Sequence, residues 1–144
     1  MKEKQDINVL DELNKGACMG RDAIHFIMDK VKDENLKKEL YRQYDKYKET
    51  NEKICKLYPE YSDSEPHKTG AVNKVMTWYG IEMKTLLDDS TSKIAELLMQ
   101  GTNMGIIEGR RILNDKNMDE EVHKIAQDYV AFQEDAVEKL KPFL

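Results

Sequence analysis

The chain has 144 residues, a length typical of one domain, and a formal net charge of −5. This acidic balance argues against a nucleic-acid partner, which needs a basic face, and against a membrane partner bound through a cationic helix. Gly (7) and Pro (3) are scarce, so the composition favours an all-α fold, which we expect to form a single domain over residues 1–144.

Two long helices are predicted in the first half of the chain. The first has an apolar stripe with alternating steps of three and four residues between Leu10 and Val31. Asp33 is the predicted N-cap of the second helix, whose inward stripe runs from Leu36 to Tyr58. Because the link between them is very short, the two helices should be antiparallel neighbours.

Three more helices are predicted in the second half. A shorter helix lies between Thr69 and Leu86, and a fourth has an apolar stripe from Ile94 to Ile112. The fifth has its stripe from Val122 to Leu140, and Asn117 with Glu120 forms a predicted capping box at its start.

The lengths of these helices indicate a four-helix bundle. The short third helix and its flanks can run the length of the bundle, between two closely linked pairs of long helices. The predicted fold is therefore a bundle with one long crossover that contains a short extra helix, as in ferritin-like folds. The alternative is a simple up-down bundle in which the third helix joins the fourth.

The segment from Thr69 to Leu113 resembles a known family in the order of four features. These are a Thr69-Gly70 start, a short helix with Trp78, the Asp88-Asp89 break and a helix that begins Ile94-Ala95-Glu96. In this order they resemble an uncharacterised bacterial family of ferritin-like bundles, a domain of unknown function, over most of the chain. For the wider ferritin-like group, the resemblance implies a carboxylate-bridged di-iron centre and iron oxidation, iron storage or peroxide reduction.

The predicted inward positions are poor in iron ligands. A di-iron centre in such a bundle needs inward carboxylates, usually with Glu-x-x-His pairs on two helices. The first helix offers none, and the two acid-x-x-His sequences, Asp22–His25 and Glu120–His123, place their histidines beside the apolar stripes. The second helix presents uncharged side chains inward: Gln43, Tyr44, Tyr47, Thr50 and Asn51. We therefore expect no cofactor, with iron as the alternative.

Four residues form a candidate buried polar cluster. Glu108 lies on the predicted inward stripe of the fourth helix, Gln133 on that of the fifth, and Tyr47 and Asn51 on that of the second. A carboxylate is almost never fully buried unless it is paired. The cluster is either a hydrogen-bonded network of the core or a ligand-binding site, and Glu108 is a weak candidate for a remnant metal position.

Glycines recur at intervals of four residues, at Gly16 and Gly20 and again at Gly101, Gly105 and Gly109. A glycine inside a helix costs ~1 kcal/mol relative to alanine, so the repeats need a packing reason. They indicate close approach of a neighbouring helix, room for bulky tyrosines, or a pocket beside the predicted cluster.

Two apolar sets on predicted outer faces favour a homodimer, because an apolar outer row must be covered. They are a second row on the fourth helix (Ala95, Met99, Ile106 and Leu113) and a patch on the first (Met19, Ala23 and Phe26). The N-terminus is charged, and the two cysteines have no CxxC spacing. These features favour a cytoplasmic location.

The leading functional hypothesis is a non-catalytic binding or interaction module that lacks a complete di-iron ligand set and has an unidentified small molecule or protein as its partner. The alternative is a di-iron carboxylate protein of the ferritin or rubrerythrin type, with an atypical site around Glu108. A third hypothesis is a small-molecule pocket lined by Tyr47, Asn51, Glu108 and Gln133, which predicts a cavity in the centre of the bundle.

Overall fold

A computed structural model describes residues 2–66, 82, 90–115 and 117–144. In these residues the structure contains four α-helices and three short 3₁₀ helices, and no strand. The α-helices are α1 (Lys2–Ile27), α2 (Glu34–Leu57), α4 (Thr91–Asn114) and α5 (Glu120–Leu140), and the 3₁₀ helices are Met28–Lys30, Tyr58–Glu60 and Lys141–Phe143. The predicted all-α class is confirmed. The predicted short helix between Thr69 and Leu86 lies outside the described residues, except for Glu82.

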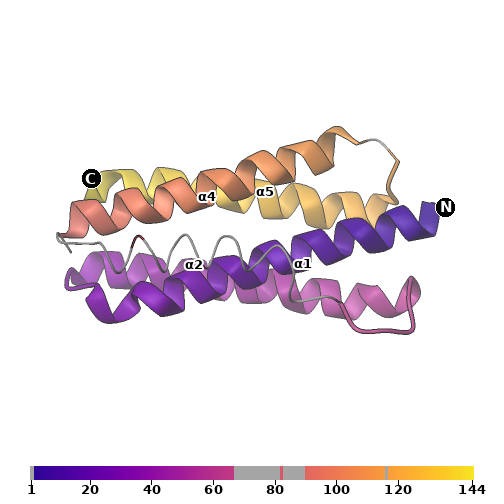
Figure 1. The fold of residues 1–144 in the computed structure, drawn as a ribbon, viewed down its shortest axis with the longest axis horizontal. Coiled ribbons are helices and arrows are strands. Elements are labelled where there is room, and N and C mark those ends of the chain that lie inside the picture. Colours follow the sequence, from indigo (N-terminus) through magenta and orange to yellow (C-terminus); the bar gives the residue numbers. More distant parts are fainter. Residues whose placement is uncertain (1, 67–81, 83–89, 116) are drawn as a thin grey trace.

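The four α-helices form two antiparallel hairpins, α1 with α2 and α4 with α5, which pack against each other (Figure 1). Helix α2 ends at one end of the bundle and α4 begins at the other, so these two helices run parallel (Figure 1). In general, two successive parallel helices of a bundle need a connection that returns from one end to the other. The parallel orientation of α2 and α4 is therefore the one expected for a bundle with a long crossover between them.

Side-chain caps mark where two of the helices begin. The carboxylate of Asp33 accepts a hydrogen bond of 2.9 Å from the backbone N–H of Leu36, as predicted for the start of α2. The hydroxyl of Ser90 accepts one of 3.2 Å from the N–H of Lys93, at the start of α4. The predicted capping box at Asn117 is wrong, because the N-cap residue of α5 is Asp119.

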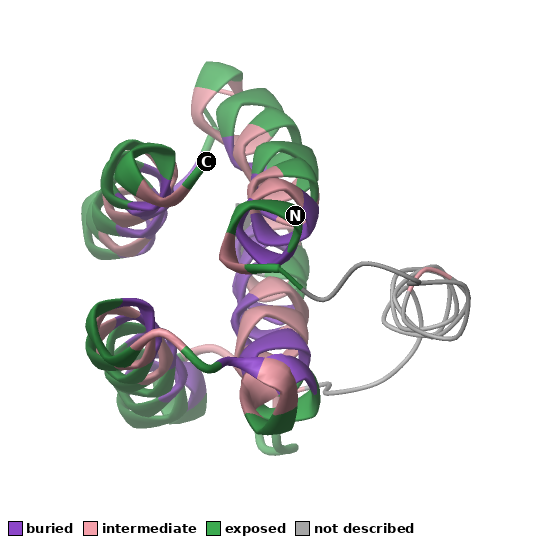
Figure 2. Ribbon diagram, turned by 90° about the vertical axis from the view of Figure 1, so that its left-hand side faces the viewer, coloured by how far each residue is buried: buried purple, intermediate pink, exposed green. Residues whose placement is uncertain are grey.

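The core lies between the hairpins, along the predicted stripes of α1, α2 and α5. Figure 2 shows buried residues on the sides of the helices that face one another. The largest fully buried apolar side chains include Leu10, Leu13, Ile27, Leu36, Leu40, Ile54, Ile94, Val122, Val130 and Leu140. Burying one such side chain contributes about 1.5–3 kcal/mol, so these stripes hold the two hairpins together.

The inward face of α4 is rotated relative to the prediction. Its buried residues take in part of each predicted row, Ile94 and Leu97 of the inner one and Ala95 of the outer one. They also include Leu98, Thr102 and Gly109, which lie between the two rows. Met99 and Leu113 of the supposed outer row pack against the core, whereas Met104 and Glu108 of the supposed inner row are exposed. The outer row that favoured a dimer is thus largely covered within one chain.

Two observations bear on the environment of the chain. Among the described residues, no helix combines the length and the apolar composition that crossing a bilayer requires. The cysteines are free thiols, with Cys18 half-buried and Cys55 exposed. The cytoplasmic location stays a prediction.

Replacing the cap of α2 should destabilise the bundle. Asp33→Ala leaves a backbone N–H at the helix start without its carboxylate acceptor, and we expect a loss of about 1 kcal/mol in the free energy of unfolding, measured by urea denaturation. The control is Asp45→Ala, an exposed aspartate inside the same helix, which should change stability by less than about 0.5 kcal/mol. Equal losses in the two variants would show that the cap is energetically silent.

Candidate functional site

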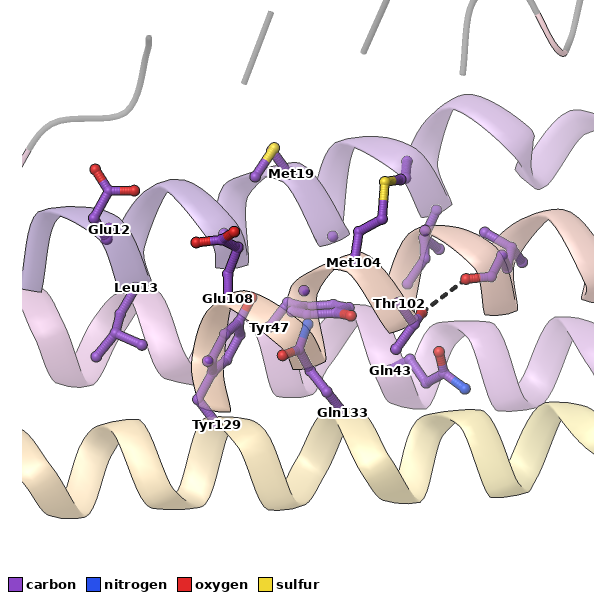
Figure 3. Close-up of a pocket in the computed structure, with 18 of the residues that line it drawn as sticks. Glu12, Leu13, Met19, Gln43, Tyr47, Thr102, Met104, Glu108, Tyr129 and Gln133 are labelled. Atoms are coloured by element: carbon purple, nitrogen blue, oxygen red, sulfur yellow. Dashed lines mark hydrogen bonds between the residues drawn. The ribbon is translucent and has the colours of Figure 1, made fainter. Parts of the chain in front are cut away.

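A cavity of about 420 Å³ lies between α1 and α4, and α2 and α5 also contribute to its lining. Small-molecule sites typically have volumes of roughly 300–1,000 Å³, so the cavity is large enough for one. Figure 3 shows Glu12, Met19, Met104 and Glu108 along one side of the cavity, with Tyr129 and Gln133 projecting toward it from the opposite side. We refer to the first group as the rim. The floor is the set of uncharged polar residues of the lining, which are Gln43, Tyr47, Thr102, Tyr129 and Gln133.

Glycines on α1 and α4 border the cavity at Gly16, Gly20, Gly101, Gly105 and Gly109. A Cβ atom added to Gly16 would lie 2.6 Å from the hydroxyl of Tyr129, and one added to Gly20 would overlap the ring of Tyr47. The glycines therefore make room for bulky tyrosines, as one of the interpretations from sequence proposed.

The same relation holds on α4. A Cβ atom at Gly105 would overlap the amide of Gln133, and one at Gly109 would overlap the side chain of Val130. Because α5 approaches α4 so closely, the side of α4 that carries Gly105 and Gly109 faces α5. It explains why the inward face of α4 departs from its predicted apolar row.

Tyr47 lies at the centre of the site and is only 3% exposed. Its ring meets those of Phe132 and Tyr129 edge to face, at centroid distances of 4.8 Å and 6.3 Å. Burial raises the pKa of Tyr47, and side-chain hydrogen bonds with Gln133 and Thr102 partly oppose that rise. Burial also raises the pKa of Tyr129 well above its ordinary value, so both phenols are neutral at neutral pH.

Gln133 brings an amide group into this apolar surrounding and is 2% exposed. Its Oε1 atom is buried and has no hydrogen-bond partner among the described residues. Figure 3 shows the side chain rising from α5 toward Tyr47. A buried acceptor without a partner typically destabilises the folded state by about 1–3 kcal/mol. A hydrogen-bond donor supplied by a ligand would remove that cost.

The predicted burial of Glu108 is wrong. Its side chain is 67% exposed and pairs with Arg111 one turn along α4, at 2.7 Å. The reason is the rotation of α4, which places Gly109 inward and leaves Glu108 at the rim of the cavity. Glu108 is thus a surface ion-pair partner at the mouth of the site.

Asn51 is buried as predicted, but it lies in a different part of the core. Its amide donates hydrogen bonds to the side chain of Asn14 at 2.7 Å and to its backbone carbonyl at 3.2 Å, and its oxygen accepts one from Arg21 at 3.1 Å. These contacts join α2 to α1. Of the four residues in the predicted cluster, Tyr47, Glu108 and Gln133 border the cavity. Asn51 instead links α2 to α1 through its hydrogen bonds with Asn14.

Two buried carboxylates on α1 were missed by sequence reasoning. Asp6 and Asp11 are 0% and 7% exposed, although the predicted first helix had no inward acid. Asp6 accepts a 2.9 Å hydrogen bond from the backbone N–H of Asp119, and burial together with Asp11 raises the pKa of Tyr58. Asp6 lies four residues before Leu10, so a longer stripe would have included it. Both acids hold the start of α1 against the loops at that end of the bundle.

The donor groups of the cavity do not fit a di-iron centre. Its floor offers phenol, hydroxyl and amide groups, whereas iron in such bundles is held by carboxylates and imidazoles. Within residues 2–66, 82, 90–115 and 117–144, no group of three or more His, Cys, Asp and Glu side chains is placed to hold a metal ion. His25 is exposed and His123 is half-buried.

Comparisons of the chain with family models, with curated proteins and with solved structures found no match. A function therefore has to be inferred from the residues that form the cavity. Those residues provide an apolar space with a polar floor and a charged rim.

Because Gly20 lies against Tyr47, replacing this glycine with alanine should destabilise the fold. Alanine at position 20 gains ~1 kcal/mol of helix propensity, but its methyl group overlaps a buried ring and should cost more than that. We expect Gly20→Ala to lower the free energy of unfolding by about 1 kcal/mol in urea denaturation. In a Tyr47→Leu background the same change should cost less or become favourable, and an unchanged penalty would contradict the contact.

The buried phenols predict instability at alkaline pH. The pKa values of Tyr47, Tyr58 and Tyr129 are raised above 10.0 in the folded chain, so above that pH the unfolded state loses tyrosine protons that the folded state keeps. The unfolded state then binds fewer protons, and the free energy of unfolding falls as pH rises above 10.0.

Urea denaturation at about pH 9 and about pH 11 measures this fall. Tyr129→Phe removes one of the buried ionising groups and should reduce it. Tyr41→Phe, at an exposed position, should leave it unchanged. A fall of equal size in both variants would show that ionisation of Tyr129 does not contribute to it.

Proposed function

We propose that this chain is a non-catalytic binding protein, a ferritin-like bundle that holds a small apolar molecule in the cavity between α1 and α4. The observation that carries the proposal is the cavity itself, about 420 Å³ in volume and lined mainly by apolar side chains and glycines. A few polar groups on an otherwise apolar lining are typical of ligand sites. Tyr47, Thr102 and Gln133 supply such groups here.

The chemistry of the lining favours binding over catalysis. Nucleophilic catalysis needs a nucleophile within hydrogen-bond reach of a general base, and general acid–base work needs a group that titrates near neutral pH. The described floor residues are amides, a hydroxyl and phenols whose pKa values are raised. The hydroxyl of Thr102 donates to the backbone carbonyl of Leu98 at 2.8 Å and so is already engaged.

The ferritin-like assignment rests on topology and on the resemblance of the segment from Thr69 to Leu113. Two antiparallel hairpins in which α2 and α4 run parallel fit the arrangement of ferritin-like folds with one long crossover. In di-iron members of that group, acids and Glu-x-x-His pairs project into the core. Here the side chains at the middle of the core are Tyr47, Thr102 and Gln133, which support a role as a binding scaffold without iron.

Homodimer formation also stays a prediction. The exposed apolar residues on the two helices that flank the cavity are Phe26 on α1 and Met104 and Ile107 on α4, at 51%, 39% and 54% exposed. They leave some apolar surface for a partner.

The proposal is tested with N-phenyl-1-naphthylamine, a neutral dye whose fluorescence rises in apolar sites. We expect saturable binding of one dye per chain. Ala23→Phe places a ring in the cavity, since Ala23 lines it and is 4% exposed, and should weaken binding at least about tenfold. The control is Ala131→Phe, at an exposed position on α5, which should leave dye affinity unchanged.

Circular dichroism and thermal melting establish that each variant is folded. Met104→Trp, at the exposed rim, is a second blocking variant for the case in which Ala23→Phe does not fold. The proposal fails if the wild-type chain shows no saturable binding, or if both blocking variants bind the dye as the wild type does.

A further inference from the structure

We propose that the cavity selects neutral, mainly apolar molecules that carry an O–H or N–H donor, which binds the amide oxygen of Gln133. This inference rests on the proposed function and adds the class of ligand. Its starting point is the Oε1 atom of Gln133, which has no hydrogen-bond partner in the part of the chain that the structure describes and belongs to a side chain that is 2% exposed and lines the cavity.

The geometry calls for a donor on the ligand. A carbonyl oxygen only accepts hydrogen bonds, so its partner has to supply the hydrogen. The nitrogen of the Gln133 amide lies against Gly105, and the oxygen is the buried atom of that amide without a hydrogen-bond partner among the described residues.

Two other polar groups on the lining, those of Gln43 and Thr102, have partners within the protein. The amide of Gln43 donates to the carboxylate of Glu39 at 2.8 Å and to the backbone carbonyl of Ala136 at 3.4 Å. The hydroxyl of Thr102 donates to a backbone carbonyl in its own helix. A ligand that entered the cavity would therefore satisfy an outstanding acceptor at Gln133 without breaking these bonds.

The charges around the cavity favour a neutral ligand. At the rim, Glu12 pairs with Lys15 at 3.4 Å and Glu108 with Arg111 at 2.7 Å, so each rim carboxylate already has a cation. The floor carries neutral groups, and a charged ligand placed on it would lose its hydration without gaining a counter-ion. A neutral molecule avoids that cost.

The walls fit an apolar body of variable shape. Leu13, Ile24, Leu98 and Ile112 supply rigid apolar surface, and Met19 and Met104 lie at the rim (Figure 3). Methionine side chains are flexible and polarizable, so they adapt to ligands of different outline. Selectivity should therefore depend on the donor more than on the shape of the apolar part.

A pair of ligands with the same ring system tests the donor. 1-Naphthol and naphthalene differ by one hydroxyl group, and their affinities are measured by displacement of the naphthylamine dye, whose own affinity is determined for each variant. We expect the wild-type chain to bind 1-naphthol about fivefold to tenfold more tightly than naphthalene. 1-Methoxynaphthalene, which keeps the oxygen and lacks the donor, should bind no better than naphthalene.

Gln133→Leu removes the acceptor and should abolish the preference for 1-naphthol while naphthalene binds at least as well as before. Gln133→Met is the second variant, because it keeps the length of the side chain. The matched control is Gln127→Leu, the same exchange at an exposed position of α5 outside the cavity lining, and it should keep the preference.

The outcomes separate this inference from the proposed function. Saturable dye binding together with equal affinities for 1-naphthol and naphthalene would overturn the donor selectivity and leave the binding site standing. A preference that survives in both Gln133 variants would show that another group recognises the hydroxyl, which also overturns it. Absence of dye binding in the wild type would overturn both proposals.

Discussion

The structure depends on large side chains of one helix packing onto glycines of the next. Tyr47 of α2 lies on Gly20 of α1, and Gln133 of α5 lies on Gly105 of α4. Each such glycine costs ~1 kcal/mol of helix propensity, which the close packing has to offset. Because the bulk comes from α2 and α5 while the glycines belong to α1 and α4, little side-chain volume remains between α1 and α4. The cavity is the consequence of that division.

Most of the helical framework could be predicted from the sequence because its signals are local. The stripes of α1, α2 and α5 each have one clear apolar face, and Asp33 is a cap that acts within its own helix turn. Helix α4 was misplaced because it carries two apolar rows with the true inward face between them. Its rotation is set by the contact of Gly109 with Val130, a tertiary contact that hydrophobic periodicity does not reveal.

Part of the site could also be predicted, because some of its residues give a local signal in the sequence. Tyr47 and Gln133 stand out as polar residues in apolar stripes, and both border the cavity. Asn51 gives the same signal, but its position one turn along α2 directs it to Asn14 instead. The exposure of Glu108 follows from the rotation of α4. The apolar pattern of α4 alone therefore does not predict this exposure.

The hollow between α1 and α4 opens at a rim where the side chains of Met104 and Glu108 are exposed, so water reaches its walls. Most of those walls are apolar, and water against apolar surface raises the heat capacity of the chain. A guest that fills the hollow would displace this water, so its binding should be accompanied by a negative change in heat capacity. Occupancy of the hollow and the heat capacity of the molecule are therefore linked.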